Sequence, residues 1–202
     1  MKVLRTTCTE DVHAFNGNGY TDEWLAEAAR RGLTNLPSAA DALPMYNAEK
    51  NVELFVKHGI YTKAEIDARA EIHIGNYTTV VSIEAKTMVN MIRHQILPAV
   101  SAYTAELCSR AAGMEHMGVS NRYASSTARE LGRYTDTLMD QCAKIEKELG
   151  RIPASAKEAM KFCHDAIIPA MDAARETADA MEMLMDIKYW PFPVYSDLLF
   201  SV

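Results

Sequence analysis

Residues 62–107, TKAEIDARAEIHIGNYTTVVSIEAKTMVNMIRHQILPAVSAYTAEL, decide the fold of this chain. Thr62 and Glu65 have the spacing of a capping box, in which a hydroxyl and a carboxylate satisfy the free N–H groups where a helix begins. Apolar residues then recur three or four positions apart, which places them on one face of a helix. They are Ile74, Val81, Ala85, Met88, Ile92, Ile96, Ala99, Tyr103 and Leu107. We therefore expect one long helix from Thr62 to about Ala112.

Two further long helices follow in the sequence. The first should end at Gly150, and its apolar stripe is Leu131, Tyr134, Leu138, Cys142, Ile145 and Leu149. The second should begin at Ala154 or Ser155, and its stripe is Met160, Cys163, Ile167, Met171, Ala174, Ala178, Met181 and Met185. Three amphipathic helices with short connections predict an all-α, up-and-down bundle of antiparallel neighbours over residues 62–189.

Two prolines lie inside these helical patterns. Pro98 falls in the first helix and Pro169 in the third. A proline has no N–H to donate, and its ring clashes with the carbonyl of the preceding turn. We therefore expect a kink at each of them.

Residues 1–61 predict short helices separated by turns, packed on the bundle. FNGNGY at residues 15–20 should form a tight turn, because Asn and Gly adopt positive φ more readily than other residues. Pro37 and Pro44 should bracket one short helix. The side chain of Asn47 is expected to cap the next helix.

The C-terminal residues 190–202, WPFPVYSDLLFSV, differ in composition from the bundle. Their two prolines should keep the segment extended, and they are too aromatic for a solvated tail. We expect this tail to pack on the bundle or on another chain. Together with the 15–20 turn, it supplies the candidates for contact with another domain or subunit: Phe15, Tyr20, Trp190, Phe192, Tyr195, Leu198 and Phe200.

The composition is that of a globular protein. Hydrophobic residues make up 49% and charged residues 24% of the 202 positions, so the chain can bury one core. The net charge of -6 disfavours nucleic acid, whose phosphates attract basic surfaces. No apolar run has the length of a signal peptide or a membrane-spanning helix, and the cysteines show no disulfide or zinc spacing. These features predict a cytoplasmic protein with no nucleic acid or membrane partner.

Residue patterns typical of catalytic or metal sites are missing from the sequence. A di-iron bundle needs Glu-x-x-His pairs, which do not occur. Gly113 and Gly118 have the spacing of a P-loop, but Val119 stands where a P-loop has its lysine. We therefore assign no catalytic, cofactor-binding or metal-binding residue in this chain.

Several segments of the sequence resemble type III glutamine synthetase. They are the FNGNGY turn, EKNVELF at 49–55, IEAKTM at 83–88, QILPA at 95–99 and WPFPVYSDLLF at 190–200. The resemblance runs from about residue 13 to the end and covers only the family's C-terminal region. It implies a parent enzyme that uses ATP and Mg²⁺ or Mn²⁺ to join ammonia to glutamate, and that assembles as a homo-oligomer from hexameric rings.

The ligands for nucleotide, metal and glutamate in that family lie upstream of this region. The resemblance therefore implies a non-catalytic packing and assembly domain, whose partner is the catalytic domain of the parent chain. The residue pattern alone also allows an independent helical adaptor that binds a peptide or protein in a groove between helices. A bundle that binds a small regulatory molecule is a third reading, which would need converging polar groups in a pocket.

Overall fold

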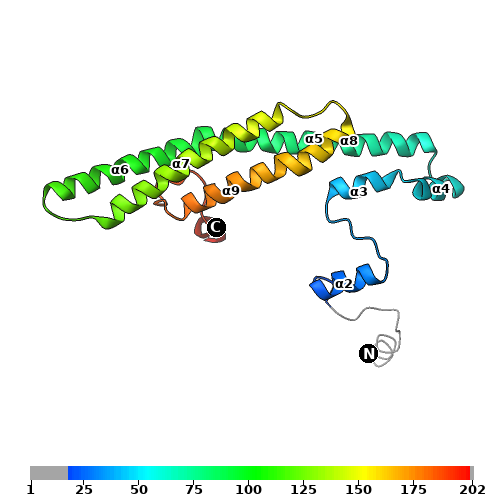
Figure 1. Cartoon of the computed structure of the whole chain (residues 1–202), viewed down its shortest axis with the longest axis horizontal. Coiled ribbons are helices and arrows are strands. Elements are labelled where there is room, and N and C mark those ends of the chain that lie inside the picture. The colour runs from blue at the N-terminus through cyan, green and yellow to red at the C-terminus, as the bar shows by residue number, and fades with distance from the viewer. Residues whose placement is uncertain (1–17, 201–202) are drawn as a thin grey trace, which may run out of the picture.

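The computed structural model describes residues 18–200, which form helices joined by turns and loops with no strand among them (Figure 1). The α-helices are α2 (Asp22–Arg30), α3 (Ala39–Tyr46), α4 (Glu49–Lys57), α5 (Lys63–Met91), α6 (Leu97–His116), α7 (Arg122–Leu149), α8 (Ala156–Phe162), α9 (Ile168–Glu182) and α10 (Tyr195–Phe200). Two π-helical turns, Ile92–Ile96 and Cys163–Ile167, join α5 to α6 and α8 to α9. The expectation of an all-α protein is confirmed.

The longest helical run begins at the predicted capping box. The Glu65 N–H donates to Thr62 Oγ1 at 3.3 Å, and the Thr62 N–H donates to Glu65 Oε2 at 2.8 Å. From there α5, the π turn and α6 continue through 29, 5 and 20 residues, past the predicted end at Ala112 to His116. At roughly 1.5 Å per residue this run is about 80 Å long. We call it the α5–α6 rod, and in Figure 1 it runs the length of the bundle.

Pro98 and Pro169, the two prolines within the long helices, each follow a π-helical turn. The turn Ile92–Ile96 precedes Pro98 in the rod, and the turn Cys163–Ile167 precedes Pro169 in the third helix. At the end of each turn a backbone N–H donates to the carbonyl five residues back, instead of four. The wider turn moves away the carbonyl that the proline ring would otherwise meet, so the helix continues past the proline. The structure thus shows a π turn beside each of these prolines, and the kink expected there stays a prediction.

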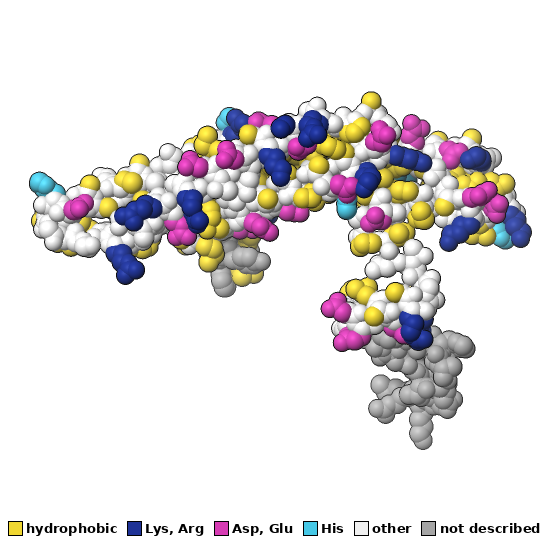
Figure 2. All heavy atoms as spheres, in the orientation of Figure 1, with side chains coloured by type: hydrophobic (Ala, Val, Ile, Leu, Met, Phe, Trp, Pro, Cys, Tyr) yellow, Lys and Arg dark blue, Asp and Glu magenta, His cyan; other side chains and the backbone are white. Residues whose placement is uncertain are grey.

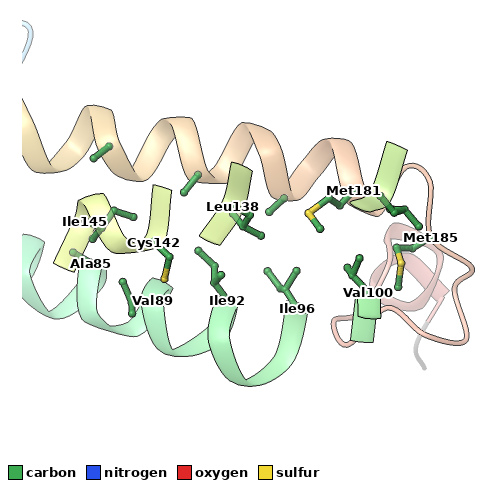
Figure 3. Packing of buried hydrophobic residues seen from close by; sticks show 14 of the residues in the cluster. Ala85, Val89, Ile92, Ile96, Val100, Leu138, Cys142, Ile145, Met181 and Met185 are labelled. Carbon is green, nitrogen blue, oxygen red and sulfur yellow. The ribbon is translucent and has the colours of Figure 1, made fainter. Parts of the chain in front are cut away.

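The core lies between the rod and two helical layers, α7 and α8–α9. Figure 3 shows Ile92 and Ile96 of the rod in one cluster with Leu138 and Cys142 of α7 and Met181 of α9. Leu138 is fully buried. Removing these apolar side chains from water is the main force that holds the three layers together.

The short helices α3 and α4 contact the beginning of the rod, whereas α2 lies apart from the bundle in Figure 1. Pro44 lies inside α3 and does not close it as predicted, because in so short a helix the proline removes only one hydrogen bond. Asn47 does not cap α4. Its side-chain amide instead donates to Asp67 Oδ1 in the rod at 3.2 Å. This tertiary contact, which local sequence does not reveal, overrides the capping preference.

From Trp190 to Val194 the tail has no regular secondary structure and bends at Pro191 and Phe192, and α10 begins at Tyr195. Pro191 and Pro193 restrict the residues beside them, but no proline follows, so the chain can form a further turn of helix. The Asp197 carboxylate accepts the Val194 N–H at 3.2 Å where this helix begins. The expectation of a tail extended throughout was wrong in this respect.

Truncating the core should destabilise the bundle strongly. We expect Leu138→Ala to lower the free energy of unfolding by about 2–5 kcal/mol, because a fully buried leucine leaves a cavity when shortened. The matched control is Met139→Ala on the same helix, where the side chain is 54% exposed and the loss should be about 0.5 kcal/mol or less. Urea unfolding followed by far-UV circular dichroism measures both. Equal losses at the two positions would contradict the described core.

Candidate functional site

The residues after α9 fold back and attach the tail to the bundle. The Tyr189 ring lies 5.2 Å from the Tyr103 ring, centre to centre, and the Tyr189 hydroxyl donates to Glu106 of α6. The rings of Trp190 and Phe192 meet edge to face at 5.9 Å, and both residues are half-buried against the core. The tail is therefore held by its own bundle as far as Phe192.

A groove of about 610 Å³ lies between α5, α9 and the tail. We call it the α5/α9 groove. Its lining is mainly apolar and includes Ile83, Met88, Met91, Met171, Trp190 and Phe192. A hollow of this volume and lining can take up several apolar side chains or one small molecule.

The charged side chains that line this groove are mostly acidic. Arg175 Nε lies 2.7 Å from Asp179 Oδ1, and this carboxylate raises the pKa of Arg175. Glu84 and Glu182 also line the groove and take part in no ion pair within residues 18–200. Since Arg175 is matched by Asp179, the groove carries an excess of negative charge.

An uncharged surface lies on α5 beside the groove. Residues 72–83, IHIGNYTTVVSI, contain no Asp, Glu, Lys or Arg. Ile72 and Val80 are 61% and 51% exposed, and Ile83 is exposed where the surface meets the groove. These three residues, which we call the α5 face, lie on one side of the helix at about 100° per residue. Exposed Asn76 and Thr79 lie on the same side, so the face combines apolar and uncharged polar side chains, which makes it a candidate contact surface for another protein part.

Sequence reasoning missed the α5 face because it followed only the buried stripe of the helix. The signal that could have found it is the run of residues 72–83 without a charge. A helix that faced water on that side would carry Lys or Glu there.

The predicted contact residues are not all exposed: some are free at the surface, and others pack on the chain's own bundle. Tyr20 is 99% exposed and Leu198 is exposed on α10, so both are free for contact with another protein part. Trp190 and Phe192 instead line the α5/α9 groove. Phe15 lies outside the described residues. The backbones of Tyr195 and Phe200 belong to α10, but their side chains lie outside what the structure describes.

His, Cys, Asp and Glu side chains are not clustered as metal ligands in the described residues. Within residues 18–200 no group of three or more His, Cys, Asp and Glu side chains could hold a metal ion. Burial raises the pKa of the Cys163 thiol, which disfavours its reactive thiolate. The residues in this part of the chain therefore do not fit a metal centre. Of its helices, none is both long and apolar enough to cross a membrane.

The fold and its surfaces define an all-α bundle with an apolar groove and an exposed apolar helix face. The family model of the glutamine synthetase C-terminal domain matches residues 1–115, which is more than half of the chain. The chain belongs to this family. The match includes residues before 13, where we did not expect the resemblance to extend.

The relatives of this chain are considerably longer. A glutamine synthetase of Butyrivibrio fibrisolvens is 35% identical over 198 residues, which cover 93% of this chain and 27% of the relative. The type-3 glutamine synthetase of Dictyostelium discoideum is 29% identical over 208 residues, or 98% of this chain and 28% of the relative. A glutamine synthetase of Bacteroides fragilis is 28% identical over 195 residues, which cover 93% of this chain and 27% of the relative. The chain thus spans about a quarter of each relative's length.

Acid should release the tail from the bundle. The hydrogen bond from Tyr189 holds the pKa of Glu106 below its usual range. This contact therefore stabilises the attached tail at neutral pH, and the stabilisation is lost as the pH falls through the lowered pKa. Trp24→Phe leaves Trp190 as the only tryptophan of the chain. In that variant we expect Trp190 emission to move to longer wavelength below the ordinary glutamic acid pKa of about 4.3.

The matched variant adds Tyr189→Phe, which keeps the ring beside Tyr103 but removes the hydroxyl. Its emission should already lie at longer wavelength at neutral pH and show no acid transition, while far-UV circular dichroism shows the bundle intact. If Tyr189→Phe leaves the emission unchanged at every pH, the hydrogen bond does not hold the tail.

Proposed function

We propose that this chain is the non-catalytic helical domain of a glutamate–ammonia ligase, and that it packs against the enzyme's catalytic part and helps to set contacts between subunits. The observation that carries the proposal is the exposed α5 face in a chain of the glutamine synthetase C-terminal family. Covering these apolar side chains in a contact would be favourable, because it removes their surface from water.

The reaction itself is assigned to the rest of the enzyme. Joining ammonia to glutamate with ATP and Mg²⁺ or Mn²⁺ needs nucleotide and metal ligands, and residues 18–200 offer no cluster that fits a metal. About three quarters of the length of the relatives lies outside the part that this chain matches, which leaves room for those ligands. We place the enzyme in the cytosol as a homo-oligomer.

The contact with the catalytic part is assigned to three exposed apolar regions. They are Tyr20, the α5 face, and the leucines Leu198 and Leu199 of α10. Each stands outside the core cluster, so covering it would not disturb the bundle. Trp190 and Phe192 support this contact indirectly, since they fix the segment from which α10 extends.

The α5/α9 groove favours a second candidate function, an adaptor that binds a peptide between helices. Met88, Met91 and Met171 line the groove, and flexible methionine side chains adapt to varied apolar partners. This function would need no catalytic part. It predicts that the chain binds its peptide by itself.

The purified chain should form no glutamine from glutamate, ammonia and ATP. In the enzyme that carries this chain, the double substitution Leu198→Asp with Leu199→Asp should lower both the assembled fraction and the activity about tenfold or more, because unpaired charges are costly in an apolar contact. Mass photometry and a glutamine assay measure the two effects.

Met139→Asp is the control for each single substitution, since it places one carboxylate on an exposed apolar side chain of α7. It should leave assembly and activity close to normal. Glutamine synthesis by the isolated chain would refute the assignment of the reaction elsewhere. Normal assembly of the doubly substituted enzyme would refute the role of α10.

A further inference from the structure

The end of the bundle where α6 turns into α7 carries exposed apolar side chains. We call residues 114–129 the hairpin tip. Met117 and Tyr123 are 79% and 63% exposed, and Val119 between them is also exposed. Gly118 makes the turn with a φ of 74°. The tip therefore exposes apolar side chains around the turn, beside a hollow of about 380 Å³ that Val119, Asn121 and Arg129 help to line.

The hairpin tip also carries positive charge. Arg122 and Arg129 are exposed and take part in no ion pair within residues 18–200. Glu115 is the one carboxylate of the tip. Figure 2 shows Lys and Arg side chains at this end of the bundle together with hydrophobic, acidic and His side chains.

The α5/α9 groove carries charge of the opposite sign. It is hollow, lined by apolar side chains such as Met88 and Trp190, and carries the unpaired carboxylates Glu84 and Glu182. The tip and the groove are thus complementary in charge, and both are apolar where they would meet. Complementary charges select a partner, and apolar contact stabilises it.

The two surfaces of one chain cannot meet each other. Ile96 lines the groove and Met117 belongs to the tip, and the continuous helix between them holds them about 30 Å apart at roughly 1.5 Å per residue. A contact between tip and groove must therefore join two copies of the chain. A two-fold axis lets each copy place its tip in the other's groove, which closes the pair.

We propose that the hairpin tip of one copy docks into the α5/α9 groove of a second copy. The inference deepens the proposed assembly function and rests on it, because it names the subunit contact that the domain makes. The groove then takes a segment of an identical chain, and not a peptide of another protein.

A charge swap tests this contact in the purified chain. The tip variant carries Arg122→Glu and Arg129→Glu, and the groove variant carries Glu84→Arg and Glu182→Arg. Analytical ultracentrifugation should show the unsubstituted chain moving from 22.5 kDa to twice that mass as its concentration rises, and more weakly at high salt. Each variant alone should dimerise about a hundredfold more weakly, because like charges then face each other. Mixing the two variants should restore the dimer, since every tip again meets a groove of opposite charge.

The control variant carries Lys144→Glu and Lys147→Glu, which change the net charge as the tip variant does but lie on the other half of α7. It should dimerise like the unsubstituted chain. In the Trp24→Phe background, Trp190 emission should change on dimerisation, because this side chain lines the groove.

Three results would overturn the proposal: a mass of 22.5 kDa at every concentration, dimers of the tip variant as strong as those of the unsubstituted chain, or a mixture of the two variants that stays monomeric. The measurement needs no catalytic part. A negative result here therefore does not bear on the proposed contact between α10 and the catalytic part. A negative result in the α10 experiment likewise does not bear on the contact between tip and groove.

Discussion

The continuity of the α5–α6 rod is the constraint on which the rest of the structure depends. The rod provides one wall of the core for both α7 and α8–α9, so a break in it would misalign two packing surfaces at once. It also anchors α3 through Asn47 and the tail through Glu106. Its stiffness sets the distance between groove and hairpin tip, and so decides which contacts fall within one chain and which join two.

Much of the helical framework could be predicted from local sequence. The capping box at Thr62, the apolar stripes and the end of α7 at Gly150 depend on residues within a turn or two of each other. The errors occurred where distant contacts outweighed local preference. Asn47 is a good capping residue, yet Asp67 in the rod engages its side chain. The prolines of the tail pointed to an extended segment, but their influence ends before α10.

The candidate surfaces were harder to predict than the core. Aromatic content singled out the tail, and the structure places Trp190 and Phe192 on the chain's own bundle. A sequence pattern indicates that a side chain is buried, but it does not show whether it packs on its own bundle or on another chain. The α5 face and the groove arise from residues on separate helices or on the outer side of one helix. Recognising the groove required the positions of α9 and the tail relative to α5, whereas the α5 face could have been found from the charge-free run of residues 72–83.

The π turns before Pro98 and Pro169 have a consequence for how this family can change in sequence. A π turn contains one residue more than an α turn, so each behaves as a single-residue insertion that a helix has absorbed. The inserted residue and the proline form an interdependent pair. Deleting the extra residue alone brings the proline ring against a carbonyl. Replacing the proline alone keeps the wider π turn, although no proline ring then requires it. Homologous chains should therefore keep both features or lose both together.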